Sequence, residues 1–276
     1  GITVNNQSPI PLTTGNSLSA AATLWAANVA IKKMGFVKKS NDLYNGTVMV
    51  IGATGSIGKV NSKVLSKKWK KLIISAPKIY KLIDLEEEIK AINPNCEVIY
   101  TTNPDRYIDE CDLVITTTSA QGKKVIDIEN VKPGCVICDV SRPFDVSKEE
   151  ARKRPDVLVI SSGEVQLPGN VEFNIDIGLE GKNVYACLAE TALLALDDRI
   201  ESFSLGRDIS YQKVFTIDSL ARKHGVKLSC IMGHDFEISE EDMELCRQEA
   251  LKKRVEADSK EMGLRLDKDS TTEATW

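Results

Sequence analysis

A glycine-rich segment that directly follows a continuous apolar run restricts the fold of this chain more than any other feature. Residues 47–51 (TVMVI) have the composition of a strand that is buried on both faces. They lead into GATGSIG at residues 52–58, and we expect a helix over residues 57–68. Glycine at three spaced positions permits a tight turn, close approach of a ligand to the backbone and close packing of the helix.

This strand, loop and helix predict a dinucleotide site. The N–H groups at the start of the helix face a pyrophosphate in such sites. The alternative is a glycine turn that only joins a strand to a helix. The candidate cofactor-binding residues of the loop are Gly52, Ala53, Thr54, Gly55, Ser56, Ile57 and Gly58.

Predicted strands alternate with predicted helices through the middle of the chain. Strands alternating with helices form a parallel sheet with right-handed crossovers. The predicted fold class is therefore α/β, a doubly wound parallel sheet of the Rossmann type. The further strands are expected at 71–75, 97–101, 113–118, 135–140 and 157–160, with a charged helix at 80–92.

Helices are also expected before and after the sheet. An alanine-rich helix over 17–34 precedes it, and Gly35 resembles a C-terminal cap. Helices at 184–200, with Asn183 as N-cap, and at 211–224 follow it. The sequence predicts a turn at residues 45–46 (NG) and a loop or small hairpin over 164–178.

Composition excludes several classes of function. The formal net charge is −4 and aromatic residues make up 5% of the chain, which disfavours a nucleic-acid-binding protein. The chain has no 18-residue apolar stretch and does not begin like a signal peptide. Seven scattered cysteines, an odd number, are expected to be reduced thiols in the cytoplasm.

The end of the second predicted strand indicates which dinucleotide the loop would bind. NAD sites carry an acidic residue there for the ribose 2′-hydroxyl, about 20 residues after the loop. Here the chain has Ser75 and Lys78 and no acid, which suits the 2′-phosphate of NADP, although Lys78 could be a solvated surface lysine. Thr117, Thr118 and Ser119 end the fourth strand, where contacts to the nicotinamide ribose are expected.

The regular pattern divides the chain into three parts. Residues 1–16 are expected to form an N-terminal loop segment, and residues 17–235 an NADP-binding Rossmann domain with its flanking helices. Residues 236–276 form a charged extension, which we expect to be a solvated helix with a disordered end. Because residue 1 is not Met, we expect the chain to be part of a longer protein.

Cys187 is the cysteine whose position most suggests chemistry. It falls in the first turn of a predicted helix, and helix N-termini favour the nucleophilic thiolate over the thiol. Glu190 lies three residues later on the same helix face and could transfer a proton or orient a substrate, although its charge opposes thiolate formation. The alternative is a small buried cysteine in an alanine- and leucine-rich helix.

Other reactive residue types have structural interpretations that are at least as good. Cys135 and Cys138 form a C-x-x-C inside an apolar strand, with no second pair at zinc-ligand spacing, so no metal site is predicted. His224 lies near a helix end, where capping or solvation suffices. Asp139 and Arg142 close the fifth strand, where they could line a site or form a loop salt bridge.

Several segments together resemble the long-chain acyl-carrier-protein reductases of cyanobacteria, which form aldehydes in alkane synthesis. The resemblance runs from about residue 13 to 226 and preserves order and spacing. The cysteine and Phe-Ser-x-Gly-Arg motifs are more specific than the glycine loop. The matching segments are 13–17 (TTGNS), 52–58, 185–190 (YACLAE), 203–207 (FSLGR) and 223–225 (KHG).

The resemblance implies NADPH-dependent reduction of an acyl thioester, acyl-carrier-protein-bound or acyl-CoA, to an aldehyde. It implies that Cys187 attacks the thioester and that Glu190, Thr14 and Asn16 line the nicotinamide end. The chain departs from the family in lacking its N-terminal acyl-handling domain, a histidine in the region of residues 162–167, and any counterpart for the extension after His234.

Other functions remain open at this stage. One alternative is a shikimate-dehydrogenase-like NADP-dependent alcohol dehydrogenase, and another is a non-catalytic NADP-binding module of a larger protein. A homo-oligomer is compatible with each of them.

Overall fold

Strands form a main sheet and a small second sheet in the computed structural model, which describes residues 1–120, 124–206 and 209–270. The main-sheet strands are β1 (Lys39–Ser40), β2 (Leu43–Ile51), β3 (Trp69–Ser75), β4 (Glu97–Thr101), β5 (Leu113–Thr116), β6 (Val136–Asp139) and β7 (Leu158–Ser161). Their order is β4-β3-β2-β5-β6-β7, all parallel, with β1 antiparallel to β2. The small antiparallel sheet has the order β10-β8-β9, from β8 (Glu164–Gln166), β9 (Asn183–Tyr185) and β10 (Lys227–Leu228).

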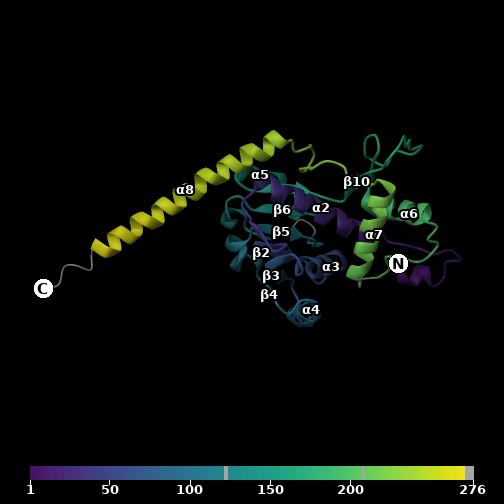
Figure 1. The fold of residues 1–276 in the computed structure, drawn as a ribbon, viewed down its shortest axis with the longest axis horizontal. Helices are drawn as coiled ribbons and strands as arrows, with labels where there is room; N and C mark the ends of the chain where they lie inside the picture. The colour runs from purple at the N-terminus through teal and green to yellow at the C-terminus, as the bar shows by residue number, and fades with distance from the viewer. Residues whose placement is uncertain (121–123, 207–208, 271–276) are drawn as a thin grey trace.

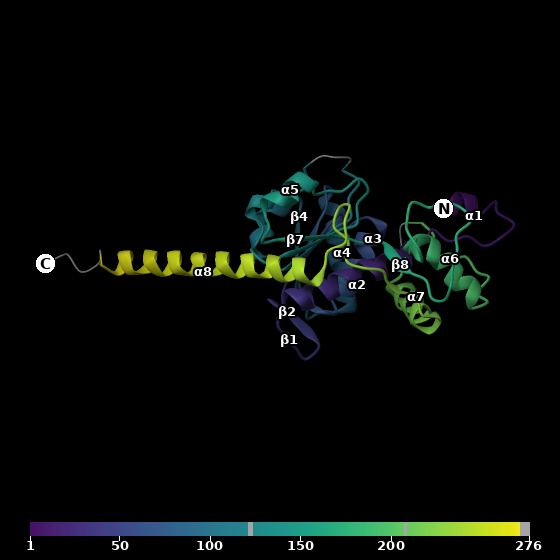
Figure 2. The ribbon, with the colours of Figure 1, turned by 90° about the horizontal axis from the view of Figure 1, so that it is seen from above.

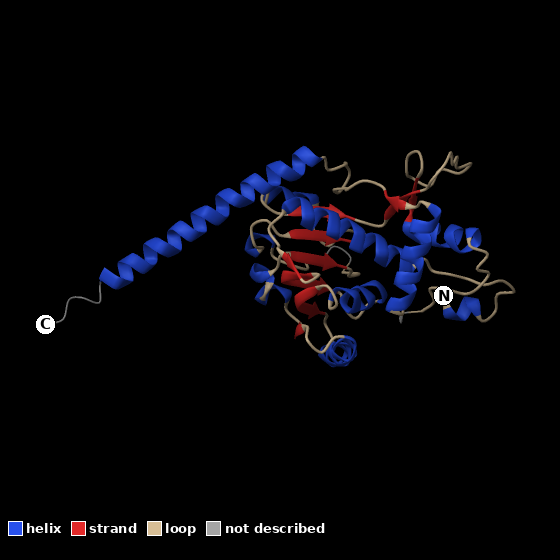
Figure 3. Cartoon of the chain, in the orientation of Figure 1, coloured by secondary structure: helices blue, strands red, loops and turns tan. Residues whose placement is uncertain are grey.

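Helices cover both faces of the main sheet (Figure 3). One face packs against α2, α3, α4 and the first turns of α8, and the other packs against η2, η3 and α5. The α-helices are α1 (Ile2–Asn5), α2 (Asn16–Met34), α3 (Ser56–Leu65), α4 (Ile79–Ile92), α5 (Lys148–Lys153), α6 (Ala186–Leu196), α7 (Tyr211–His224) and α8 (Glu240–Ser270). The 3₁₀ helices are η1 (Pro104–Arg106), η2 (Ile108–Glu110) and η3 (Ile128–Asn130). This is the predicted doubly wound α/β fold of the Rossmann type.

Burial on both faces explains why the strands read as continuous apolar runs. In β2, Val48 and Val50 belong to the core under α2, while Met49 and Ile51 belong to the core on the other face. β2 lies between β3 and β5, with Val48 opposite both Leu72 and Leu113. A third core joins the first turns of α2 to α6, α7 and the small sheet, so α2 connects both regions (Figure 1).

The predicted turn at residues 45–46 is wrong. Residues 45–46 lie within β2, and the turn is at Asn41 and Asp42, whose φ angles are +48° and +63°. These residue types tolerate the left-handed region, and the turn joins β1 to β2. Gly46 allows close packing instead, because a Cβ there would lie 2.5 Å from Asp112 Oδ2.

The ends of two predicted segments also change. Residues 183–185 form β9 because they pair with β8, so α6 begins at Ala186 with Tyr185, not Asn183, as its N-cap. Residues 1–16, predicted as a loop, contain the short helix α1. The long helix, its Gly35 cap with φ of +69°, and α7 agree with the sequence prediction.

Helix α8 begins against the sheet and then projects away from the rest of the chain (Figures 1 and 2). Met243 and Cys246 are buried in the core under α2, and Ala250 is also buried, so the helix is solvated only in part. The predicted disordered end at residues 271–276 lies outside the described residues. Among the described residues, no helix combines the length and apolarity needed to cross a membrane.

Asp156, the acidic member of a buried ion pair, also binds α8. Arg154 donates to Asp156 and to the carbonyls of three residues around η3, and both side chains are almost fully buried. Lys253 of α8 donates to Asp156 Oδ1 at 2.6 Å. Burial raises the pKa of Asp156, but the hydrogen bonds from Arg154 and Lys253 outweigh it and hold that pKa below its ordinary value.

We predict that Asp156→Asn lowers the free energy of unfolding by about 3 kcal/mol, because it leaves a buried guanidinium without its counter-charge. Lys253→Met, which removes only the half-exposed partner, should cost about 1 kcal/mol or less. Urea unfolding of the three proteins measures both values. Because the folded pKa of Asp156 is depressed, its contribution is present above about pH 4 and is lost as the pH falls through the folded value. An Asp156→Asn protein as stable as the parent at pH 7 would contradict this account.

Candidate functional site

The glycine loop between β2 and α3 depends on two positions without side chains. Gly52 has a φ of +78°, and its N–H donates to the Ser75 carbonyl at 2.9 Å. A Cβ on Gly58 would lie 2.4 Å from the Gly52 carbonyl oxygen and 2.6 Å from Thr117 Oγ1. The first turn of α3 therefore packs directly on the end of β2, as the sequence pattern predicts.

Among the residues that the structure describes, no side chain caps the start of α3. Gly55 is the N-cap, and the first turn of α3 contains no acidic residue. The first N–H groups of a helix lack intrahelical partners, and they attract anions together with the helix dipole. This helix end can therefore accept a phosphate.

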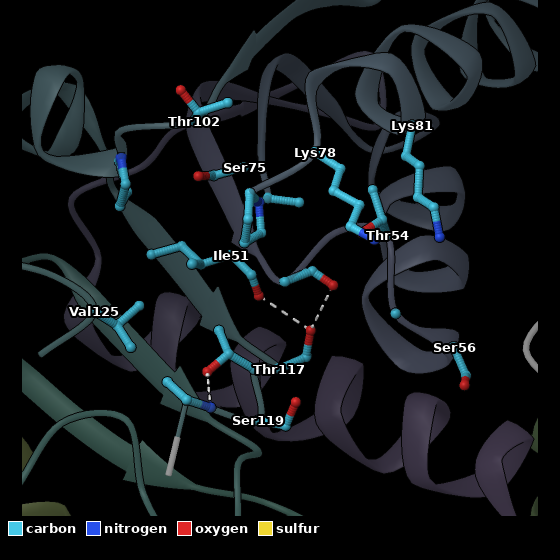
Figure 4. A pocket seen from close by; sticks show the side chains of 17 residues that line it. Ile51, Thr54, Ser56, Ser75, Lys78, Lys81, Thr102, Thr117, Ser119 and Val125 are labelled. Carbon is cyan, nitrogen blue, oxygen red and sulfur yellow. Dashed lines mark hydrogen bonds between the residues drawn. The ribbon is translucent and has the colours of Figure 1, made fainter. Parts of the chain in front are cut away.

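A cavity of about 630 Å³ lies along this loop at the carboxyl ends of β2, β3 and β5 (Figure 4). The predicted site residues that line it are Gly52, Thr54, Gly55, Ser56, Ser75, Lys78, Thr117, Thr118 and Ser119. The cavity does not include Ala53, Ile57 or Gly58: Ala53 is buried in the core, Ile57 packs against the core around α6 and α7, and Gly58 lies beneath the loop.

The end of β3 and the start of α4 give one side of the cavity a basic character. Lys78 and Lys81 both extend from this side (Figure 4). No acidic residue belongs to the described lining of the cavity. The sequence analysis missed Lys81, which could have been found from its spacing of one helical turn after Lys78. It also missed Thr102 and Val125, which come from loops without a recognisable motif.

A buried polar network holds the opposite side of the cavity. Thr118 donates its N–H to Ser141 Oγ at 2.9 Å and its hydroxyl to Asp145. Asp139 accepts backbone N–H groups from Ser141, Asp145 and Val146, and burial raises the pKa of its carboxyl. Asp139 thus fixes the loop of Ser141 and Asp145, and this loop in turn binds Thr118. Among the described residues, Asp139 neither lines the cavity nor forms a salt bridge.

Cys187 lies elsewhere, as the second residue of α6, and its side chain is exposed. The start of α2 packs onto it: a Cβ on Gly15 would lie 2.2 Å from Cys187 Cα. Thr14, Asn16 and Glu190 therefore gather with Cys187 and do not line the cavity along the glycine loop.

Glu190 joins the starts of α2 and α6. It is fully buried, its Oε2 accepts the Leu18 N–H at 2.8 Å, and its Oε1 accepts the hydroxyl of Thr13. A carboxylate at a helix N-terminus is stabilised by the N–H groups and the dipole. The negative charge that seemed to oppose a Cys187 thiolate is therefore engaged by α2.

The Phe-Ser-x-Gly-Arg motif binds residues 14–17, at the start of α2, through Ser204. Ser204 accepts the Thr14 N–H through its carbonyl at 2.8 Å, and its hydroxyl lies 2.6 Å from that of Ser17. Arg207 of this motif lies outside the described residues. The described part of the motif thus positions the residues beside Cys187.

The remaining candidates have structural roles. Cys135 and Cys138 lie in the cores on opposite faces of the sheet, where burial raises the pKa of Cys138 to about 12. No cluster suited to a metal ion occurs among the described residues. His224 and Lys223 bind Asp197 at the end of α6, and these hydrogen bonds, that of Lys223 first, lower the pKa of Asp197 to about 2.

Comparison with known proteins identifies the domain at the glycine loop. The family model of the shikimate / quinate 5-dehydrogenases matches residues 36–164, which contain the loop and most of the main sheet. The chain carries an NAD(P)-binding Rossmann domain. This Rossmann domain has the sequence character of NAD(P)-dependent oxidoreductases, and the match ends before Cys187.

Two curated relatives extend beyond the Rossmann domain into the Cys187 region. Aminotransferase PigE of Serratia sp. is 32% identical over 230 residues, 79% of this chain and 25% of PigE. The long-chain acyl-(acyl-carrier-protein) reductase of Synechococcus elongatus is 26% identical over 222 residues, 77% of this chain and 60% of the reductase. The chain therefore spans only part of the length of either relative.

A solved structure is similar over about half of the chain. Quinate dehydrogenase from Corynebacterium glutamicum in complex with NAD is 15% identical, with a TM-score of 0.39. The similarity covers 53% of this chain and 51% of that enzyme.

We predict that Gly58→Ala weakens NAD(P)H binding by at least about tenfold, because the new methyl group displaces the loop from the end of β2. Gly55→Ala is the matched comparison. Its Cβ would lie 3.2 Å from the Gly52 carbonyl oxygen, so a smaller effect is expected. Cofactor fluorescence titration measures the affinities, and thermal melting shows whether each variant is folded. Unchanged affinity in folded Gly58→Ala would show that the loop does not hold the cofactor.

Proposed function

We propose that this chain reduces an acyl thioester to an aldehyde with NADPH, through a thioester on Cys187. The observation that carries the proposal is the exposed thiol at the start of α6, fixed by the backbone of Gly15 and the buried carboxylate of Glu190. A thiol that served only packing would not need an exposed position. The relative in Synechococcus elongatus, which is named for acyl reduction, supports the choice of substrate class.

The proposed chemistry begins with transfer of the acyl group. The Cys187 sulfur attacks the thioester carbonyl carbon, a new carbon–sulfur bond forms, and the bond to the carrier sulfur breaks. The carrier leaves as a thiolate that takes a proton, and the acyl group stays on Cys187. When bound, a reduced nicotinamide supplies the hydride that converts this acyl group to an aldehyde and restores the cysteine.

The residues at the glycine loop fit a dinucleotide with a 2′-phosphate. The cavity along residues 52–56 and the open start of α3 suit a pyrophosphate, while Ser75, Lys78 and Lys81 supply a hydroxyl and two cations. Thr117, Thr118 and Ser119 would lie toward the nicotinamide ribose. NADP is therefore the proposed cofactor.

Glu190 acts in this proposal as a positioning residue. Both of its oxygens accept hydrogen bonds and its side chain is fully buried, so it does not reach a substrate. It keeps the Thr13–Ser17 segment against the start of α6, where Thr14 and Asn16 would line the nicotinamide end beside Cys187.

The proposed organisation follows the sequence interpretation. Residues 17–235 form the NADP-binding unit with its flanking helices, and residues 1–16 and 236–276 lead toward other parts of a larger cytoplasmic protein. Because the relatives are longer than this chain, the acyl carrier and the chain length of the acyl group depend on those parts.

A second candidate function is an NADP-dependent alcohol dehydrogenase. The observation that favours it is the match of the shikimate / quinate 5-dehydrogenase model to residues 36–164. This function would need no cysteine, so the behaviour of Cys187 separates the two. Cofactor binding without any turnover would indicate a third possibility, a non-catalytic binding module.

We predict that mixing the protein with a panel of acyl-CoA thioesters, without cofactor, adds the mass of one acyl group on Cys187. The Cys187→Ala protein should carry no adduct and should lose aldehyde formation by at least about a thousandfold. Intact mass and peptide mapping measure the adduct. Cys230→Ala, which removes another partly exposed thiol, is the control and should behave as the parent. Full reductase activity in Cys187→Ala would contradict the covalent mechanism.

We predict that replacing Lys78 and Lys81 together by Ala raises the dissociation constant of NADPH by about tenfold and leaves that of NADH unchanged, because only NADPH carries the 2′-phosphate. Lys70→Ala, an exposed lysine outside the cavity, serves as the control. Tighter binding of NADH than of NADPH by the parent protein would overturn the assignment of NADP.

A further inference from the structure

A second cavity of about 270 Å³ lies at the other end of the main sheet, away from the glycine loop. Tyr44, Trp69 and Leu113, at or next to the first residues of β2, β3 and β5, form its inner side. Residues of helices α2, α3 and α7 line most of the rest. It shares no lining residue with the cavity along the glycine loop.

Small residues of α2 leave this space open. Ala21 and Ala27 face it, where larger apolar residues would fill it, and Leu65 and Leu113 are buried at its base. The cavity exceeds the roughly 150 Å³ that holds benzene in an engineered protein core. Its volume therefore suits an aliphatic chain of several carbons.

Two polar atoms of the aromatic walls, the Tyr44 hydroxyl and the Trp25 indole N–H, already have partners within the protein. The Tyr44 hydroxyl donates to Asn28 Oδ1 at 2.7 Å, and Trp25 Nε1 donates to Asp218 Oδ1 at 2.7 Å. A ligand in contact with these walls is therefore not required to supply hydrogen bonds, which favours an apolar body.

The charged residues of the lining are mostly cations. Lys39, Lys68 and Arg222 are exposed and basic, and Asp218 is the one acidic member among the described lining residues. Asp218 is engaged by Trp25 and Arg222, and Lys39 pairs with Asp42 at 2.9 Å. Lys68 is thus the cation of the lining that forms no ion pair among the described residues. Lys68 directly precedes Trp69, so a positive charge adjoins the aromatic wall. An anion is favoured at this position.

We propose that this cavity binds a small amphiphilic carboxylate, with its apolar chain between Trp25, Trp69 and Phe215 and its carboxylate near Lys68. The proposal combines an apolar space of defined volume, aromatic walls in which the polar atoms of Tyr44 and Trp25 are paired within the protein, and the cation Lys68 at the rim. It does not rest on the proposed reductase function, because it uses neither Cys187 nor the glycine loop.

Tryptophan fluorescence can test the proposal directly. Two of the three tryptophans, Trp25 and Trp69, line the cavity, and the third, Trp276, is the last residue of the chain. Octanoate added to the whole chain without dinucleotide should change the fluorescence to a saturating value. Octanol should bind more weakly, and octylamine should not bind, because the rim is basic. Absence of a saturable change with octanoate, or equal binding of octylamine, would overturn the proposal.

Paired variants locate the effect. Lys68→Glu should weaken octanoate binding by about three- to tenfold, and less so at high salt, while octanol binding stays the same. Lys70→Glu makes the same charge change outside the cavity and should leave binding of both ligands unchanged.

Ala27→Leu, which fills the space, should abolish binding of both ligands. Thermal melting and retained NADPH binding verify that each variant is folded, and Ala21→Leu replaces Ala27→Leu if that variant unfolds. Unaltered octanoate binding in both Lys68→Glu and the folded filled variant would overturn the assignment to this cavity.

Discussion

The contact between the backbone of Gly58 and the carbonyl of Gly52 is the constraint on which the rest of the cofactor domain depends. A Cβ at Gly58 would stand 2.4 Å from that oxygen, so only glycine lets α3 begin directly above the end of β2. The position of α3 fixes both the open N–H groups at its start and the cavity beside Ser75 and Thr117. Burial of β2 on both faces then holds this end of the strand in place.

Helix α2 packs on both the main sheet and the region of Cys187, and so connects them. Its later turns belong to the sheet core, while its first turn meets α6, where the buried carboxylate of Glu190 accepts the Leu18 N–H. Without that carboxylate, the buried N–H of Leu18 would have no acceptor. Leaving a buried N–H group unpaired lowers the free energy of unfolding by more than an exposed hydrogen bond contributes. The position of Cys187 thus depends on a helix that also packs on the cofactor domain.

The sequence predicted those parts of the structure that depend on local pattern. Strands buried on both faces leave continuous apolar runs, and the glycine loop leaves spaced glycines, so β2 to β7 and the cavity along residues 52–58 could be found. Residues 45–46 were wrongly predicted as a turn because they lie where the register between β2 and β3 shifts, between the paired residues Tyr44 and Thr47, and the strand continues through this irregularity. The contact of Glu190 with Leu18 joins residues 172 positions apart, and no local pattern reveals it. The spacing of Lys81 from Lys78 is a sequence signal for one helix face, but the position of that face beside the loop comes from the placement of the first turn of α4.

The distribution of charge, rather than its sum, decides which ligands the chain can hold. The net charge of −4 argues against extended polyanions, yet the cavity along the glycine loop has two lysines and no acid in its described lining. Several acidic residues make hydrogen bonds or ion pairs within the protein. Asp139 binds three backbone N–H groups, Asp156 binds Arg154 and Lys253, and Glu190 binds the start of α2. At the second cavity, Arg222 and Lys39 pair with Asp218 and Asp42. Lys78 and Lys81 at the first cavity and Lys68 at the second form no ion pair among the described residues, so their charges remain available to an anionic ligand.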